Sequence, residues 1–136
     1  MPWVVDTCLL IDIADADPQF ATGSAALLNA RRSEGLIVAP VTYVELAPVF
    51  DGDVARQELF LYHLEVSWPQ VWTHAETLAA HAAWQRYVQA KRVRRIQKRP
   101  MADLLIGAFA ERRDGLLTRN ETDFRSVFPN LRIVVP

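Results

Sequence analysis

Short apolar segments that alternate with longer amphipathic ones constrain the fold of this 136-residue chain more than any other feature. The apolar segments are residues 3–5, 36–39, 115–118 and 131–135. Each is too short for a helix and suits a parallel strand that is covered on both faces. Their alternation with helical patterns, in a chain long enough for one ordinary domain, predicts a single α/β domain over residues 1–136. We expect a central parallel sheet of four to five short strands flanked by helices.

Capping signals and prolines set the expected helices between these strands. Thr42-x-x-Glu45 and Thr73-x-x-Glu76 both have the pattern of a capping box, and Asp53 can cap a further helix. A first helical stretch begins near residue 9 and ends before residue 18, and residues 71 and 72 form either a short strand or an extended link. The later helices are expected over residues 19–32, 42–50, 53–66, 73–99, 101–113 and 121–128, and Pro48 is expected to kink or end the second of these.

Composition and missing motifs exclude several classes of function. With 51% hydrophobic and 23% charged residues the chain has the composition of a folded globular protein, and no apolar run approaches the roughly 18 residues of a membrane span. Cys8 is the only cysteine, and the N-terminal segment lacks a secretory pattern, so we expect a cytoplasmic protein. The motifs of nucleophilic hydrolases and of nucleotide-binding loops are missing. His74 and His81 are about 10 Å apart on one helix, which is too far to share zinc.

Acidic residues follow the predicted strands at the points where ligands bind in α/β proteins. Asp6 comes directly after the first strand, Glu45 follows the second, and Asp123 follows the strand that ends near Thr118. The carboxyl ends of parallel strands meet at one edge of the sheet. Asp103 joins this group if its helix begins at the same edge. Clustered carboxylates require a positive partner, and ligands that are all oxygen suit Mg²⁺ or Mn²⁺, so a metal-dependent phosphodiesterase is the natural inference.

Each acid also has a purely structural interpretation. Acids are favoured in the first turn of a helix by capping and by the helix dipole. Reciprocal capping with Thr42 accounts for Glu45, a cap at Asn120 accounts for Asp123, and Asp103 stands near a helix start. Only Asp6, a charge at the end of an apolar strand, is awkward for this interpretation.

Four segments together resemble the PIN-domain family, and most closely the VapC ribonuclease toxins of toxin–antitoxin systems. The segments are VDTCLLID from Val5, TYVEL from Thr42, DLLIGA from Asp103 and LTRNETDF from Leu117, and their order and spacing cover nearly the whole chain. Gly107 stands where many relatives have alanine, a departure that affects only the packing of its helix.

The resemblance implies a PIN fold, endoribonuclease activity with Mg²⁺ or Mn²⁺, and inhibition by a cognate VapB-like antitoxin. The acids that it assigns to catalysis and metal binding are Asp6, Glu45, Asp103 and Asp123. Thr118 and Asn120, in the segment that resembles the family's T-x-N-x-x-D-F motif, support the metal site, as does Thr7 beside Asp6. We also expect a homodimer. A water activated by the metal would attack the phosphorus in line.

Basic residues are concentrated in one segment although the formal net charge is only -1. Arg92, Arg95 and Arg99 share one face of a continuous helix shortly before Asp103 and are candidates for contacts with RNA phosphates. The same face could be a solvated helix end or could pair with an acidic antitoxin segment. Arg119, inside the acid-rich motif, is a separate candidate for a phosphate contact.

Two other functions compete with the ribonuclease. The first is a noncatalytic RNA- or protein-binding module of PIN-like fold, in which the acids only cap helices. The second is a phosphatase, which is weaker because Asp6-Thr7-Cys8 lacks the second acid of the Asp-x-Asp phosphotransfer pattern.

Overall fold

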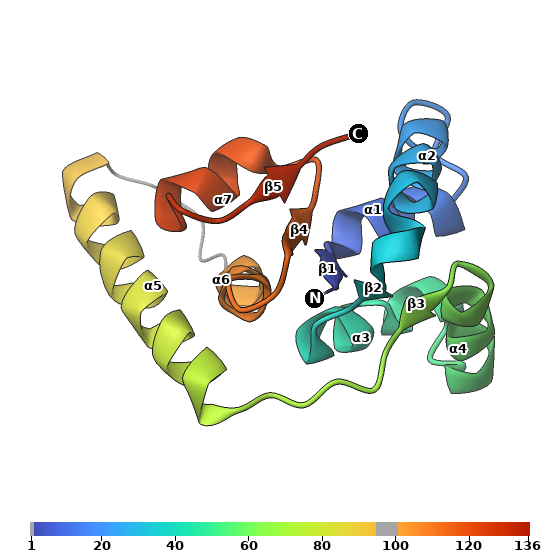
Figure 1. The fold of residues 1–136 in the computed structure, drawn as a ribbon, viewed down its shortest axis with the longest axis horizontal. Coiled ribbons are helices and arrows are strands. Elements are labelled where there is room, and N and C mark those ends of the chain that lie inside the picture. Colours follow the sequence, from blue (N-terminus) through green and yellow to red (C-terminus); the bar gives the residue numbers. More distant parts are fainter. Residues whose placement is uncertain (1, 95–100) are drawn as a thin grey trace.

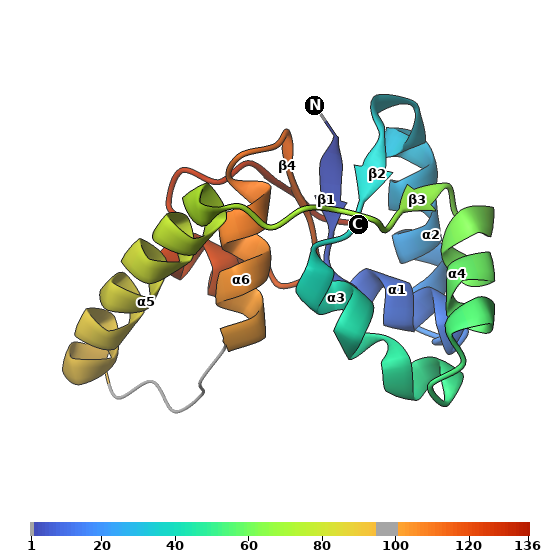
Figure 2. The same ribbon diagram turned by 90° about the horizontal axis from the view of Figure 1, so that it is seen from below.

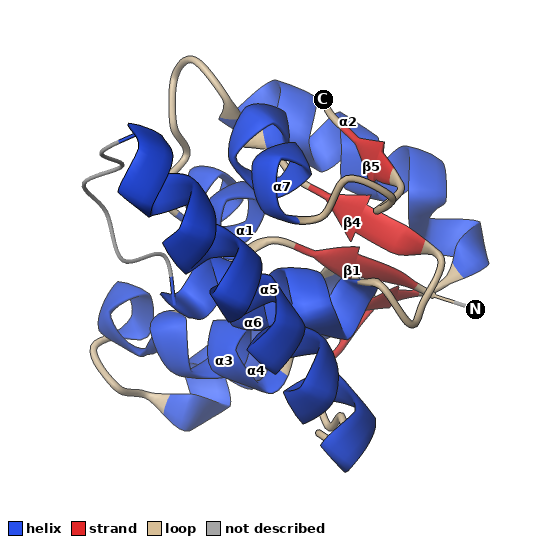
Figure 3. Ribbon diagram, turned by 90° about the vertical axis from the view of Figure 1, so that its left-hand side faces the viewer, coloured by secondary structure: helices blue, strands red, loops and turns tan. Residues whose placement is uncertain are grey.

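The computed structural model describes residues 2–94 and 101–136, which form an α/β fold around one parallel sheet (Figure 3). The sheet has five strands in the order β3-β2-β1-β4-β5. Strands β2 and β3 therefore lie on one side of β1, and strands β4 and β5, which come later in the chain, lie on the other side. The strands are β1 (Trp3–Val5), β2 (Leu36–Ile37), β3 (Val66–Ser67), β4 (Gly115–Leu117) and β5 (Ile133–Val134).

Helices cover both faces of the sheet, as the apolar strands require (Figure 1). Alternate side chains of β1 enter two separate cores, with Val4 in one core and Trp3 and Val5 in the other. The core around Val4 includes residues of α5, α6 and α7, and the core around Trp3 includes residues of α1, α2 and α4. The α-helices of the described residues are α1 (Thr7–Ala14), α2 (Ala21–Arg31), α3 (Pro40–Glu45), α4 (Val54–His63), α5 (His74–Arg94), α6 (Met101–Ala110) and α7 (Glu121–Val127).

The register of β1 against β4 places the candidate site. Val5 pairs with Leu117, so Asp6 and Thr118 are the next residues along two neighbouring parallel strands. The strand order reverses direction between β1 and β4, and in open α/β sheets ligands bind at the carboxyl ends of the strands at such a point. The expected sheet of four to five parallel strands is thus confirmed, with its switch point beside Asp6.

Several of the expected helices have different bounds: α6 ends at Ala110 and not near Arg113, and the end expected for the helix over residues 73–99 lies outside the described residues. The predicted helix over residues 53–66 is wrong at its end, because α4 stops at His63 and Val66–Ser67 pairs with β2 as strand β3. Glu65 adopts a left-handed backbone conformation (φ 58°), which turns the chain between the two elements. The predicted helix over residues 42–50 is wrong at its start, because α3 begins at Pro40. It ends at Glu45, before the break expected at Pro48, and a separate 3₁₀ helix covers Ala47–Phe50.

Several local predictions are confirmed. The Asp53 side chain accepts a hydrogen bond from the backbone N–H of Arg56 (3.1 Å) and caps α4. The Glu76 carboxylate accepts a hydrogen bond from the backbone N–H of Thr73 (2.9 Å) at the start of α5, as in a capping box. Residues 71 and 72 form an extended link and no strand. No helix of the described residues is both long and apolar enough to cross a membrane.

Candidate active site

Asp6 lies at the start of a helix, but its side chain forms hydrogen bonds with other side chains and does not cap the helix. It occupies the N-cap position of α1, and its carboxylate makes no capping hydrogen bond. Oδ2 instead accepts a 2.6 Å hydrogen bond from the Thr118 hydroxyl and one from the Cys8 thiol (3.3 Å). Asp6 is 3% exposed and Thr118 is fully buried. The capping interpretation therefore does not explain this acid, which faces the neighbouring strand at the switch point.

Burial dominates the electrostatics around Asp6. It raises the pKa of the Asp6 carboxyl above its ordinary value against the hydrogen bonds from Thr118 and Cys8, and the negative charge of Glu45 raises it further. Burial, followed by the charge of Asp6, also raises the pKa of the Cys8 thiol to about 12. A thiol with this pKa stays protonated at neutral pH, so Cys8 is a hydrogen-bond donor to Asp6 and no nucleophile.

Glu45 reaches the site through Thr7. The Thr7 hydroxyl donates a 2.7 Å hydrogen bond to Oε1 of Glu45, and the Thr42 hydroxyl lies 3.0 Å from that of Thr7. Thr7 belongs to α1, and the other two residues belong to α3 (Figure 2). Glu45 is the last residue of α3, and Thr42 lies inside this helix. The capping-box interpretation of the pair is therefore wrong. An acid at a helix C-terminus is unfavourable for the helix dipole, so the local structure gives no reason for Glu45 to be there.

The other two predicted acids begin helices near the same edge. Asp103 is in the first turn of α6, where it is half-buried, and Asp123 is in the first turn of α7, where it is exposed. Asn120 occupies the N-cap position of α7 but makes no side-chain capping bond, so its expected role as that cap is wrong. Its backbone N–H donates to the Thr118 hydroxyl (2.9 Å), which links the motif to Asp6.

The described residues include no group of three or more His, Cys, Asp or Glu side chains that converges closely enough to hold a metal ion. What the fold brings together is the pair of Asp6 and Glu45, with Thr7, Thr42 and Thr118 around it. The pair supplies only oxygen donors and two carboxylates, a chemistry that suits a hard divalent cation. The four-acid metal set thus stays a prediction.

Arg119 has a partner that the sequence analysis did not assign. Its guanidinium donates to both carboxylate oxygens of Asp12, from Nε to Oδ2 (2.7 Å) and from Nη2 to Oδ1 (2.9 Å). Asp12 is 4% exposed. A single charge in the apolar run from Leu9 to Ala14 was the signal in the sequence that could have indicated a buried ion pair.

The structure does not describe the side chains of the remaining candidates for RNA contacts. Arg95 and Arg99 belong to the segment 95–100, and although Arg92 is within α5, its side chain is not described. These three residues stay predictions.

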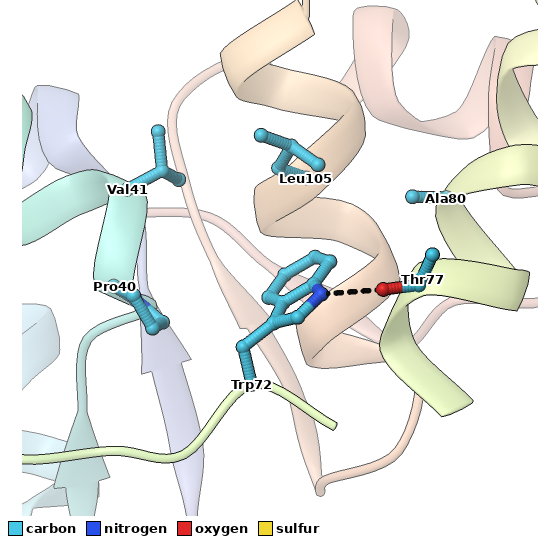
Figure 4. A pocket seen from close by; sticks show the side chains of 6 residues that line it. All are labelled: Pro40, Val41, Trp72, Thr77, Ala80 and Leu105. Atoms are coloured by element: carbon cyan, nitrogen blue, oxygen red, sulfur yellow. Dashed lines mark hydrogen bonds between the residues drawn. The ribbon is translucent and has the colours of Figure 1, made fainter. Parts of the chain in front are cut away.

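Two of the hollows on the described surface bear on the candidate site. One, of about 650 Å³, is lined by residues 119–123 with Phe20, Val135 and Pro136, and so adjoins Asp123. The other, of about 330 Å³, lies between α3, α5 and α6, and no acidic residue lines it (Figure 4). Trp72 in this second hollow donates a hydrogen bond to Thr77 (2.8 Å) and stacks on Phe109, so its ring packs against the core.

The structure thus defines an α/β protein with five parallel strands and a buried acid at the switch point of its sheet. The PIN domain family model matches residues 3–127, which is most of the chain, and the chain belongs to this family. PIN domains are generally nucleases. No curated protein matches the chain.

Proposed function

We propose that this PIN domain is an endoribonuclease that depends on Mg²⁺ or Mn²⁺ and acts as a VapC-like toxin. The observation that carries the proposal is the hydrogen bond between Thr118 and the buried Asp6 at the switch point, with Glu45 close enough to raise the pKa of Asp6. Helix capping explains neither acid. A buried carboxylate with a raised pKa and a second acid beside it is typical of a functional site.

In this proposal Asp6, Glu45, Asp103 and Asp123 hold the divalent ion. When bound, the ion lowers the pKa of a water molecule and neutralises charge on the scissile phosphate. Thr118 fixes the orientation of the Asp6 carboxylate, and Thr7 fixes that of Glu45. Positive charge at the site would keep Asp6 ionised despite its burial. One acid of the set would orient the attacking water or accept its proton.

The proposal includes three partners. The substrate is RNA, bound in part by the basic segment that contains Arg92, Arg95 and Arg99. A VapB-like antitoxin inhibits the enzyme, and two copies of the chain form a homodimer. Large apolar side chains exposed on α3 and α4, namely Val44, Val54, Leu59 and Tyr62, support an interaction with protein. We place the protein in the cytoplasm, where Cys8 stays reduced.

Cleavage of a mixed cellular RNA pool tests the proposal. The purified protein is incubated with Mg²⁺, with Mn²⁺ or with EDTA, beside the variants Asp6→Asn and Asp15→Asn. Asp15 is an exposed acid at the end of α1 and serves as the matched control. We expect discrete metal-dependent cuts that Asp6→Asn loses and Asp15→Asn keeps. RNA binding without cutting, in folded protein free of antitoxin, would instead favour the noncatalytic binding module.

The toxin assignment has a separate test. A small protein encoded beside the gene is co-expressed with the chain, and the complex is purified and assayed for RNA cleavage. Inhibition that is relieved when the partner is digested supports the antitoxin. Unchanged cleavage in a stable complex would leave a ribonuclease with a different regulator.

A further inference from the structure

The partly buried ion pair between Asp12 and Arg119 lies beside the site, and Asp12 does not belong to the predicted set of acids. Asp12 is in the second turn of α1, and both of its carboxylate oxygens accept hydrogen bonds from Arg119. Oδ2 also accepts a hydrogen bond from the Ser24 hydroxyl of α2 (2.9 Å). The two parallel N–H···O bonds are the bidentate arrangement that fixes a guanidinium in both distance and direction.

The loop between α1 and α2 completes the surroundings of Arg119. The guanidinium carbon of Arg119 lies 3.9 Å from the centre of the Phe20 ring, so the cation stacks on the aromatic face. The backbone N–H groups of Gln19 and Phe20 donate to Oδ1 of Asp17 (2.8 and 2.9 Å), and the N–H of Asp17 donates to the Asp12 carbonyl (2.9 Å). Phe20 is therefore connected to α1 through the Asp17 side chain and the backbone hydrogen bond from Asp17 to Asp12.

Arg119 is flanked by the two residues that contact the site. Thr118 donates to Asp6, and the backbone N–H of Asn120 donates to Thr118. The segment from Thr118 to Asn120 is thus attached to α1 at two points, one at Asp6 and one at Asp12. Six residues of helix place these points about 9 Å apart along its axis. One attachment would allow the segment to pivot, whereas two fix its direction.

We propose that Asp12 and Arg119 are positioning residues that set the orientation of the segment leading into α7, and with it the placement of Asp123 relative to Asp6. This inference rests on the proposed nuclease function. It replaces the interpretation of Arg119 as a phosphate contact, because Nε and Nη2 are bound to Asp12, one face is stacked on Phe20, and Asp12 neutralises the charge. The Arg119 side chain is 28% exposed, and an ion pair that is partly open to water adds little net stability, so stability alone gives little reason for this one.

Conservative variants with matched controls test the proposal. Arg119→Lys keeps the charge and loses the bidentate geometry, and its control is Arg125→Lys, which alters an exposed ion pair with Glu121 on α7. Asp12→Asn removes the charge of the carboxylate, and its control is Asp15→Asn on the same helix. If Asp12→Asn fails to fold, Arg119→Lys carries the test.

The decisive measurement is whether a variant changes kcat or KM. Both are determined with a single-stranded RNA oligonucleotide at several salt concentrations. We expect kcat to fall by about 10- to 100-fold in Arg119→Lys and in Asp12→Asn, because small misplacements of reacting groups have effects of this size. KM and its dependence on salt should stay at the wild-type values, and both control variants should behave as wild type.

Two results would overturn the proposal. One is unchanged kcat in the folded variants. The other is a raised KM in Arg119→Lys together with a change of about 0.7 in its logarithmic salt slope, the signature of one lost phosphate contact to a single strand.

If the wild-type protein cuts no RNA, the proposed nuclease function is contradicted. The positioning role of Asp12 and Arg119 can still be tested in that case. Amide hydrogen exchange then compares residues 119–124 in Asp12→Asn and Asp15→Asn. A loss of protection confined to this segment in Asp12→Asn supports the two-point attachment. Equal exchange in the two variants contradicts it.

Discussion

The Thr118 hydroxyl donates a 2.6 Å hydrogen bond to Oδ2 of Asp6, although the two residues are 112 positions apart in the chain. Each residue directly follows a strand, and those strands are β1 and β4, which pair in parallel register at the switch point of the sheet. The sheet itself therefore orients the acid before any substrate binds. Donors and acceptors that are fixed in this way need no rearrangement during the reaction.

Asp6→Asn should abolish RNA cleavage without lowering the free energy of unfolding. Burial raises the pKa of Asp6 above 3.8, so the ionised carboxylate destabilises the folded state, and stability falls as the pH rises from that value through the raised pKa. An amide removes this penalty and still offers Thr118 an oxygen. In EDTA we expect the variant to be at least as stable as the wild type at pH 7, with the difference vanishing near pH 3, as measured by urea unfolding. A variant less stable than the wild type at pH 7 would contradict this account of the site.

Glu45→Gln should abolish cleavage and leave the free energy of unfolding within about 0.5 kcal/mol of the wild-type value. The reason is that Glu45 ends α3 and caps no helix, and its side chain is exposed. Thr7 can still donate to the amide oxygen of glutamine. Thermal and urea unfolding, measured beside RNA cleavage, check the prediction. A loss of 1 kcal/mol or more, the usual size for a lost cap, would restore the structural interpretation of this acid.

The sequence predicted the parallel sheet and placed Asp6 and Thr118 correctly because both depend on local patterns, namely an apolar run and the polar residue that ends it. Strand β3 was missed because it has only two residues, which is too few to show the alternating pattern of a strand, and because it closely follows an amphipathic helix. The pairing of Val66 with Leu36 identifies the strand, and that is a tertiary contact.

The two capping-box patterns also show that a local pattern alone does not determine where a helix begins. Thr73-x-x-Glu76 and Thr42-x-x-Glu45 have the same spacing, and only the first begins a helix. Pro40 starts α3 two residues early and so moves Glu45 to the far end of its helix. The ion pair of Asp12 with Arg119 joins residues 107 positions apart, a distance that no local pattern spans.

Glu76→Gln should destabilise the protein, in contrast to the same substitution at Glu45. Burial raises the pKa of this carboxyl, but hydrogen bonds from Thr73 and Arg113 overcome that effect and lower the pKa to about 2. Loss of these charge-assisted bonds costs about 2 kcal/mol at pH 7. The stabilisation is present above the unfolded pKa near 4.5 and is lost as the pH falls toward 2, so the two proteins should converge in acid.

Urea unfolding between pH 3 and pH 7 measures this difference. The matched control is Glu65→Gln, which alters an exposed ion pair with Arg32 and should change stability by less than about 0.5 kcal/mol. A constant difference between Glu76→Gln and wild type across the whole pH range would show that packing, and not the carboxylate charge, is responsible.

Gly107→Ala and Gly23→Ala should have opposite effects although both are the same substitution in a helix. A Cβ atom at Gly107 would occupy the space of the Phe128 ring, which is 1% exposed and held in the core, so alanine should cost about 1–3 kcal/mol. A Cβ atom at Gly23 would meet only the Pro136 side chain at 3.6 Å, and alanine should stabilise α2 by up to about 1 kcal/mol. Thermal and urea unfolding of both variants check the signs. If Gly107→Ala is as stable as the wild type, Phe128 is free to move, and α6 does not require the glycine.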